Sequence, residues 1–152
     1  MIASRGFTLL ELMVVLVILT LIVALAPPLL SGLGVTTELR GSARQLAAGL
    51  RAARNAAITQ QRAVTLMVDL DNRTFQVSSD PRIIGLPAED KVKIELYTAQ
   101  SELLSDKTGN IRFFPDGSST GGHVTLADDK VMYRVNVDWL TGRVNIEDRD
   151  VQ

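Results

Sequence analysis

The chain begins with a run of apolar positions that is almost unbroken. From Leu12 to Ala26 only Thr20 is polar, and a single carboxylate, Glu11, directly precedes the run. The twenty residues from Phe7 to Ala26 would form an α-helix about 30 Å long, which matches the hydrocarbon thickness of a bilayer. Fourteen of them are Leu, Ile, Val or Phe, and they favour insertion by about 4–8 kcal/mol, more than the ~2.5–3.5 kcal/mol that a central charge costs. The pattern therefore predicts a membrane-spanning helix that keeps Glu11, and an ionisable group in such a helix is a candidate functional residue.

Pro27-Pro28 follow this run and predict either the end of the membrane helix or a hinge. Apolar residues then recur at spacings of three and four, which predicts a second helix from Thr36 or Thr37 to about Gln61. The apolar stripe consists of Leu39, Ala43, Leu46, Leu50, Ala53 and Ala57.

A second stripe on this helix is basic and consists of Arg40, Arg44, Arg51, Arg54 and Arg62. It is either a solvated face with local ion pairs or a docking surface for an acidic neighbouring subunit or for lipid phosphates. The sequence leaves both interpretations open.

After residue 62 the apolar period changes to two, which is typical of strands. A first strand is expected at 64–70 and a return strand at 74–78, with Phe75 and Val77 facing inward. Further strands are expected at 92–96, 110–114, 122–127, 131–137 and 143–147, with loops at 80–91 and 99–109. A long helix followed by a string of short antiparallel strands predicts an α+β fold.

Composition and charge narrow the function further. The 152 residues carry a net charge of −1 and no cysteine, so disulfides and thiolate metal sites are excluded, and no overall basic excess points to nucleic acid. Arg5 is the only charged residue before Glu11, and the next basic residue is Arg40. Because basic residues next to a membrane-spanning helix stay on the cytoplasmic side, the N-terminus is expected in the cytoplasm and the residues after the span in the periplasm.

The N-terminus has two interpretations. In one it is an ordinary secretory signal with Ala24-Leu25-Ala26 as the cleavage site, although cleavage there would leave Pro27 as the new N-terminus and gives Glu11 no role. In the other, the order Gly6-Phe7-Thr8-Leu9-Leu10-Glu11 before an apolar run resembles the class III signal of type IV pilins and type II secretion pseudopilins.

That resemblance implies a particular maturation and membrane topology. A prepilin peptidase would cleave between Gly6 and Phe7, remove residues 1–6 as a leader and methylate the Phe7 amine. Residues 7–30 would span the bacterial inner membrane once and later form the filament core, and residues 31–152 would form a periplasmic, type IV pilin-like α+β domain with the long helix packed on antiparallel sheet. Glu11 would match the family's assembly glutamate and meet the amine of a neighbouring subunit.

The stretch from Phe113 to Gly122 is the most distinctive part of the domain. It lacks the lysine and spacing of a phosphate-binding loop, and its Ser119, His123 and Asp116 are sequence neighbours without a nucleophile elbow, so no hydrolase is expected. Its Phe-x-Pro-x-Gly-x-x-x-Gly-Gly pattern, with Thr-Gly-Arg at 141–143, resembles the H family of minor pseudopilins. Trp139 is expected in core or turn packing, or otherwise as an interface anchor.

The resemblance implies a structural subunit near the tip of a type II secretion pseudopilus, which helps to export folded proteins across the outer membrane. Its partners would be other minor and major pseudopilins, the prepilin peptidase, the inner-membrane assembly platform and membrane lipid. No enzymatic activity and no cofactor are expected. No metal is expected either, since Asp128-Asp129 is too short an acidic cluster for calcium. The alternative is a minor type IV pilin of the DNA-uptake type, but the mostly acidic 147–150 does not favour nucleic-acid binding.

Overall fold

A computed structural model describes residues 8–150 of the chain, with the side chains of residues 8–22 and 37–149. The chain divides into two compact units, residues 1–36 and residues 37–152. Each unit is described by itself below.

The helix α1 is one continuous element of 52 residues, Leu9–Gln60. The prediction that a helix ends at Pro27-Pro28 and that another begins at Thr36 or Thr37 is therefore wrong. A proline removes one donor from the ladder, but its fixed φ of about −65° is itself helical. Strong helix formers stand on both sides of the pair, so the backbone remains helical across the missing bonds.

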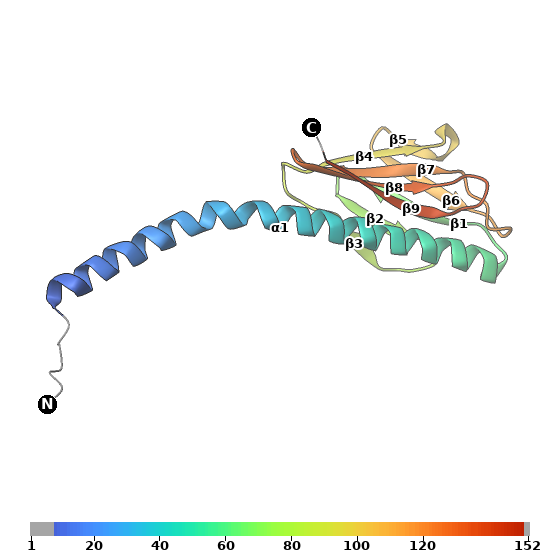
Figure 1. Cartoon of the computed structure of the whole chain (residues 1–152). Helices are drawn as coiled ribbons and strands as arrows, with labels where there is room; N and C mark the ends of the chain where they lie inside the picture. The colour runs from blue at the N-terminus through green and yellow to red at the C-terminus, as the bar shows by residue number, and fades with distance from the viewer. Residues whose placement is uncertain (1–7, 151–152) are drawn as a thin grey trace, which may run out of the picture. The chain divides into compact units, whose positions relative to one another are not determined.

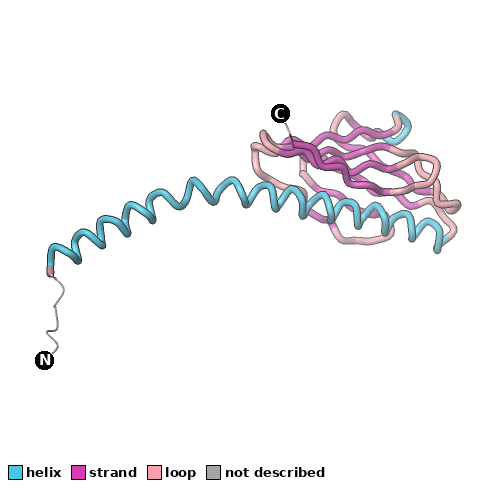
Figure 2. The backbone as a smooth tube through the Cα atoms, viewed as in Figure 1, coloured by secondary structure: helices cyan, strands magenta, loops and turns pink. Residues whose placement is uncertain are grey.

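Among the described residues, nine strands follow the helix, and all of them belong to the second unit (Figure 1). Their bounds are β1 (Val64–Asp69), β2 (Thr74–Val77), β3 (Ile83–Gly85), β4 (Lys93–Thr98), β5 (Leu103–Ser105), β6 (Thr108–Phe113), β7 (Gly122–Ala127), β8 (Val131–Val137) and β9 (Val144–Asp150), with the 3₁₀ turn η1 (Gln100–Glu102) before β5. Figure 2 shows the strands lying along the C-terminal half of α1.

The strands form two antiparallel sheets, and the predicted α+β class is confirmed. One sheet has the order β3-β2-β1-β6-β5 and the other β4-β7-β8-β9. The strands predicted at 122–127 and 131–137 have the observed bounds, whereas β3 and β5 lie inside segments predicted to be loops. Both are three-residue edge strands, too short to produce an alternating pattern.

The domain core forms where the apolar stripe of α1 meets the sheets. All six stripe residues, Leu39, Ala43, Leu46, Leu50, Ala53 and Ala57, are fully buried, as the 3.6-residue period predicts. Phe75 and Val77 face inward, also as predicted. Gly49 permits a close approach of the sheet to the helix, because a Cβ there would lie 2.9 Å from the Phe75 ring. The helix and the first sheet therefore pack through a small residue facing a large one.

The two sheets meet where β4 passes β6. The Thr98 hydroxyl donates a hydrogen bond to the Asn110 carbonyl at 2.6 Å. Nearby, Arg112 on β6 donates two hydrogen bonds to the Glu102 carboxylate, at 2.7 and 3.1 Å. The Glu102 side chain is only 7% exposed and that of Arg112 36%, and the carboxylate raises the pKa of Arg112. Glu102 and Arg112 thus tie the η1 segment to the first sheet with a bidentate ion pair.

Glu102→Gln should lower the free energy of unfolding by about 1–3 kcal/mol, because it leaves the half-buried Arg112 guanidinium without its counter-charge. The exposed Glu95 has no ion pair among the described residues, so Glu95→Gln is the matched control, with an expected change within about 0.5 kcal/mol. Urea unfolding of the full chain in a non-ionic detergent, followed by circular dichroism, measures both. Equal effects of the two substitutions would show that the Glu102–Arg112 pair adds no stability.

Candidate functional site

The start of α1 carries a helix cap that the sequence analysis missed. Gly6 and Phe7 lie outside the described residues. The Thr8 hydroxyl oxygen accepts a hydrogen bond from the Glu11 backbone N–H at 3.3 Å, which makes Thr8 the N-cap and Glu11 the third helical residue. Thr-x-x-Glu is the sequence pattern of a capping box, and it could have been recognised in the sequence. The exposed Glu11 carboxylate therefore lies in the first turn, where the helix dipole favours negative charge.

Beyond Glu11 the helix surface is apolar on every side. Twelve large apolar side chains between Leu9 and Ile22 are each 49–77% exposed. The Thr20 hydroxyl donates to the Leu16 carbonyl at 2.6 Å, so it satisfies its donor inside the helix. A helix that is apolar all round is normally buried in lipid or between other helices.

Within the described part of the chain, no helix combines the length and the apolar character that a membrane span requires. The predicted span covers residues 7–30, of which Phe7 and the side chains of 23–30 lie outside what the structure describes.

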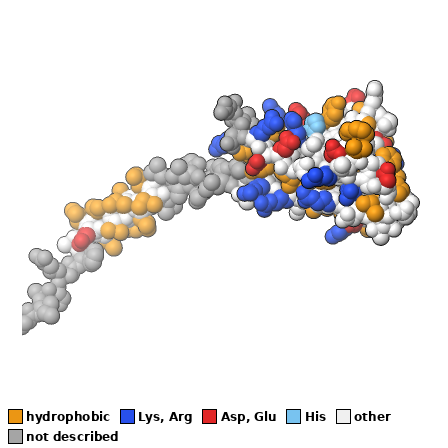
Figure 3. All heavy atoms as spheres, turned by 45° about the vertical axis from the view of Figure 1, so that its right-hand side comes forward, with side chains coloured by type: hydrophobic (Ala, Val, Ile, Leu, Met, Phe, Trp, Pro, Cys, Tyr) orange, Lys and Arg blue, Asp and Glu red, His pale blue; other side chains and the backbone are white. Residues whose placement is uncertain are grey.

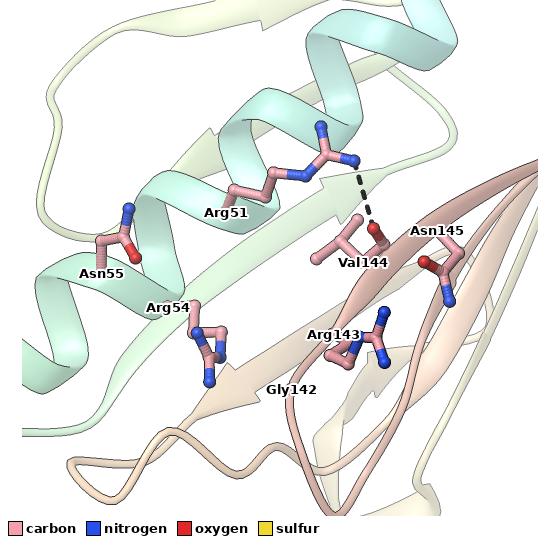
Figure 4. Close-up of a pocket in the computed structure, with 7 residues that line it drawn as sticks. All are labelled: Arg51, Arg54, Asn55, Gly142, Arg143, Val144 and Asn145. Carbon is pink, nitrogen blue, oxygen red and sulfur yellow. Dashed lines mark hydrogen bonds between the residues drawn. The ribbon is translucent and has the colours of Figure 1, made fainter.

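In the domain, two of the predicted basic residues bind the backbone of their own chain. The Arg51 guanidinium donates a hydrogen bond to the Val144 carbonyl at 3.1 Å, drawn as a dashed line in Figure 4. Arg54 Nε donates to the carbonyls of Gly117, at 3.1 Å, and Thr141, at 3.2 Å. Arg54 therefore joins α1 to both distinctive segments of the domain, the 113–122 loop and the turn before β9.

Gly142 allows the turn before β9 to approach the 113–122 loop. Its φ is +62°, in the left-handed region that favours glycine, and a Cβ there would overlap the Gly117 carbonyl oxygen. The turn itself is held by Asp138, whose carboxylate accepts hydrogen bonds from the Thr141 N–H at 2.8 Å and from the Thr141 hydroxyl at 2.7 Å. These bonds hold the pKa of Asp138 below its usual value.

Two cavities lie between α1 and β9, and together they are called the β9 groove here. The first, of about 330 Å³, is lined by Arg51, Arg54, Asn55, Gly142, Arg143, Val144 and Asn145. The second, of about 220 Å³, is lined by Arg40, Arg44, Tyr133, Ile146 and Asp148. The structure thus brings four of the five predicted arginines beside one strand. The fifth, Arg62, lies beyond the end of α1 and bonds the Gln60 side chain.

The prediction of core packing for Trp139 is wrong, because its side chain is 66% exposed. Its backbone is the part that packs: the Trp139 carbonyl accepts a hydrogen bond from the Ser119 N–H at 2.8 Å, and a Cβ on Gly121 would lie 2.9 Å from the Trp139 Cβ. The turn therefore positions this residue through its main chain and leaves the indole in solvent.

The hydroxyl and carboxylate groups of the 113–122 loop are used in local turns. Asp116 accepts hydrogen bonds from the Ser118 N–H and hydroxyl, at 2.9 and 2.6 Å, which lower its pKa. The Ser119 hydroxyl donates to the Arg112 carbonyl at 2.8 Å. His123 stacks on Tyr97, with ring centroids 5.0 Å apart, and burial lowers its pKa. Ser119, His123 and Asp116 thus make separate local interactions and do not form a triad.

Among the described residues, no group of three or more His, Asp or Glu side chains is placed to hold a metal ion. The acidic pair Asp128-Asp129 has a structural use, since the Asp128 carboxylate accepts hydrogen bonds from the N–H groups of Lys130 and Val131. The candidate functional surfaces are therefore the start of α1 and the β9 groove.

Comparison with known families matches both parts of the chain. Residues 42–141 match the family model described as type II transport protein GspH, and residues 1–27 match the prokaryotic N-terminal methylation motif. The chain is 33% identical over 141 residues to type II secretion system protein H of Xanthomonas campestris pv. campestris, an alignment that covers 92% of this chain and 81% of that protein.

Solved structures with a similar fold include pilin-like proteins of two other bacteria. The type IV minor pilin FimU of Pseudomonas aeruginosa matches with a TM-score of 0.58 at 15% identity, over 77% of this chain and 95% of FimU. The minor pseudopilin EpsH of the Vibrio cholerae type 2 secretion system matches with a TM-score of 0.51 at 13% identity, over 72% of this chain and 96% of EpsH. At these identities the likeness concerns the fold alone.

Arg54→Met keeps the aliphatic stem but removes the hydrogen bonds to Gly117 and Thr141, and should lower the free energy of unfolding by about 1–3 kcal/mol. Hydrogen exchange at the Gly117 and Gly142 amides should also become faster. Arg62→Met is the matched control and should change stability by no more than about 0.5 kcal/mol. Unchanged stability and exchange in Arg54→Met would refute the joining role of this residue.

Proposed function

Because the chain belongs to the GspH family of type II transport proteins, we propose that it is a minor pseudopilin, incorporated near the tip of a periplasmic type II secretion pseudopilus, where it helps to export folded proteins across the outer membrane. The observation that carries this proposal is the joining of an N-terminal methylation motif to a GspH-type domain in one chain. The role is structural, with no catalytic step.

The proposed location follows from the apolar segment and from Arg5. Residues 7–30 would cross the inner membrane once, with the N-terminus in the cytoplasm and residues 31–152 in the periplasm. The exposed apolar surface between Leu9 and Ile22 supports this placement, because lipid tails would cover it before assembly and neighbouring helices afterwards. The partners would be other minor and major pseudopilins and the inner-membrane assembly platform.

The proposed maturation removes residues 1–6 by prepilin peptidase cleavage between Gly6 and Phe7, followed by methylation of the Phe7 amine. A singly methylated amine remains cationic. The new positive end would stand within about one helical turn of Glu11, whose carboxylate the cap at Thr8 already places in the first turn. Maturation would thus bring a fixed positive charge to the end of the helix where Glu11, the only acid between Phe7 and Ala26, lies.

Glu11 would then fix the axial position of one subunit relative to the next. A carboxylate and a Phe7 amine of the neighbouring subunit at ~4 Å attract each other by about 4 kcal/mol at an effective dielectric near 20, before desolvation is counted. Because no other ionisable side chain lies between Glu11 and Ala26, this one pair would select the axial position of the helix among its neighbours.

A minor type IV pilin of the DNA-uptake type is the second candidate, and the similarity to FimU is the observation in its favour. The relative at 33% identity is a secretion protein. The last described residues of β9 include Glu147 and Asp148, which would repel a phosphate backbone. Secretion is therefore the function that we propose.

Glu11→Gln should reduce co-purification of this chain with other pseudopilins from detergent-solubilised membranes by about tenfold or more, since about 1.4 kcal/mol corresponds to tenfold. Glu11→Asp, which keeps the charge, should retain part of the association. Thr8→Ala is the control, because it removes the hydroxyl cap but leaves the carboxylate, and it should co-purify nearly as well as the wild type.

Equal co-purification of Glu11→Gln and wild type would refute the positioning role of Glu11. A loss with Thr8→Ala as large as that with Glu11→Gln would assign the effect to the helix cap instead of to the charge. Export of a secreted enzyme, measured in the same strains, should fall in parallel with co-purification.

A further inference from the structure

The strand β9 forms one edge of the second sheet, in the order β4-β7-β8-β9, and it is seven residues long. The edge strands of the other sheet, β3 and β5, have three residues each. An edge strand presents a row of backbone groups that can pair with another chain, and proteins usually limit this by short edges, prolines or bulges. β9 contains no proline, and its register with β8 is regular from Val144 to Asp150.

The outward backbone groups of β9 can be identified from two hydrogen bonds. The Arg143 carbonyl accepts from the Asp138 N–H at 3.0 Å, so the groups of this residue point towards the β8 side. The Val144 carbonyl accepts from Arg51, so it points away from β8. Because the direction alternates along an antiparallel strand, the N–H and C=O groups of Ile146 and Asp148 also point outward. Among the described residues, Arg51 is the only group that bonds to this outer edge.

The outer edge of β9 lies beside a row of arginine side chains. Arg40, Arg44, Arg51 and Arg54 line the β9 groove from α1, and Arg143 lines it from the strand side. None of these five takes part in the four ion pairs found in the described part of the chain. Among the described residues that line the two cavities, Asp148 is the only acid. Figure 3 shows several groups of Lys and Arg side chains on the visible face of the domain, with Asp and Glu side chains beside some of them.

We propose that the β9 groove binds an extended acidic segment of another polypeptide, which adds to the second sheet as a strand beside β9. Main-chain hydrogen bonds to Val144, Ile146 and Asp148 would supply affinity, as in other cases of strand addition. Carboxylates on alternate residues of the incoming strand would face the arginines of α1.

The geometry favours an extended peptide as the occupant. The arginines follow the strand along its length, and a strand of seven residues extends about 23 Å, so the charges and the free backbone groups run in parallel. Arg51, which bonds the Val144 carbonyl, would turn to an incoming carboxylate and release that carbonyl. This inference does not depend on the proposed secretion function, because it concerns only recognition by the domain.

A synthetic seven-residue peptide tests the proposal, with glutamate at the second, fourth and sixth positions and valine or threonine between them. It should bind the full chain in a non-ionic detergent, and the same peptide with lysine in place of glutamate should not. Arg44→Gln and Arg51→Gln should each weaken binding about three- to fivefold, as expected for partly solvated charges. Arg62→Gln, which lies outside the groove, is the matched control and should bind as the wild type does.

The backbone contribution is tested at Asp148, whose side chain is exposed and whose N–H points outward. Asp148→Pro removes that donor without removing a bond to β8. Asp148→Ala removes the same carboxylate but keeps the donor. Asp148→Pro should bind the peptide about five- to tenfold more weakly than Asp148→Ala.

Peptides methylated on alternate backbone nitrogens keep the test independent of how well the protein variants fold. Methylation along the edge of the peptide that pairs with β9 should abolish binding, whereas methylation along the opposite edge should preserve it. Equal binding of both methylated peptides, or equal binding of the glutamate and lysine peptides, would overturn the proposal.

Discussion

The N-terminal part of α1 carries an apolar surface that the described part of the chain leaves exposed, and the proposed location and assembly of the protein follow from it. Between Leu9 and Ile22 every large apolar side chain stands in the open, and at about 25 cal/mol per Å² such a surface is costly to leave in water. Lipid or neighbouring helices must therefore cover it. A single acid at the start of this surface, held in the first turn by Thr8, is costly in an apolar environment and favours a partner of opposite charge.

In the second unit, the C-terminal half of the same helix packs against the sheets of its own chain. There the apolar residues form a narrow stripe that is fully buried against the sheets, and Gly49 lets the Phe75 ring approach closely. Arg54 then connects the helix to the 113–122 loop and to the turn before β9 through backbone carbonyls. The helix α1 thus has an exposed apolar surface in its N-terminal part and, in its C-terminal part, a buried apolar stripe that packs into the domain core. The basic residues beside β9 provide a further surface, and none of them takes part in an ion pair among the described residues.

Much of this fold could be predicted from the sequence, because the hydrophobic period is strong where the elements are long. The apolar stripe and the strands β7 and β8 follow directly from their spacing. β3 and β5 were missed because three residues produce no readable alternation, and the continuity of α1 was missed because proline was weighted above its flanking helix formers. For Trp139 the sequence predicts core or turn packing, or an interface anchor, whereas in the structure the turn holds this residue by its backbone and leaves its side chain exposed.

The candidate site could be predicted only in part from the sequence. The Thr8-x-x-Glu11 cap is local and could have been recognised by its spacing. The β9 groove depends on the pairing of β9 with β8 and on its position beside α1, and contacts between residues about 93 positions apart, such as Arg51 with Val144, leave no signal in a single sequence. Helical spacing predicted that the arginines share a face, but not which strand they would lie beside.

The intact mass of the natural product, measured after extraction from bacterial membranes, tests directly whether the apolar helix is kept after processing. We expect a chain that has lost Met1–Gly6, carries one added methyl group and retains the entire apolar helix with Glu11. A chain shortened through Ala26, or recovered without its apolar segment in the water-soluble periplasmic fraction, would contradict it.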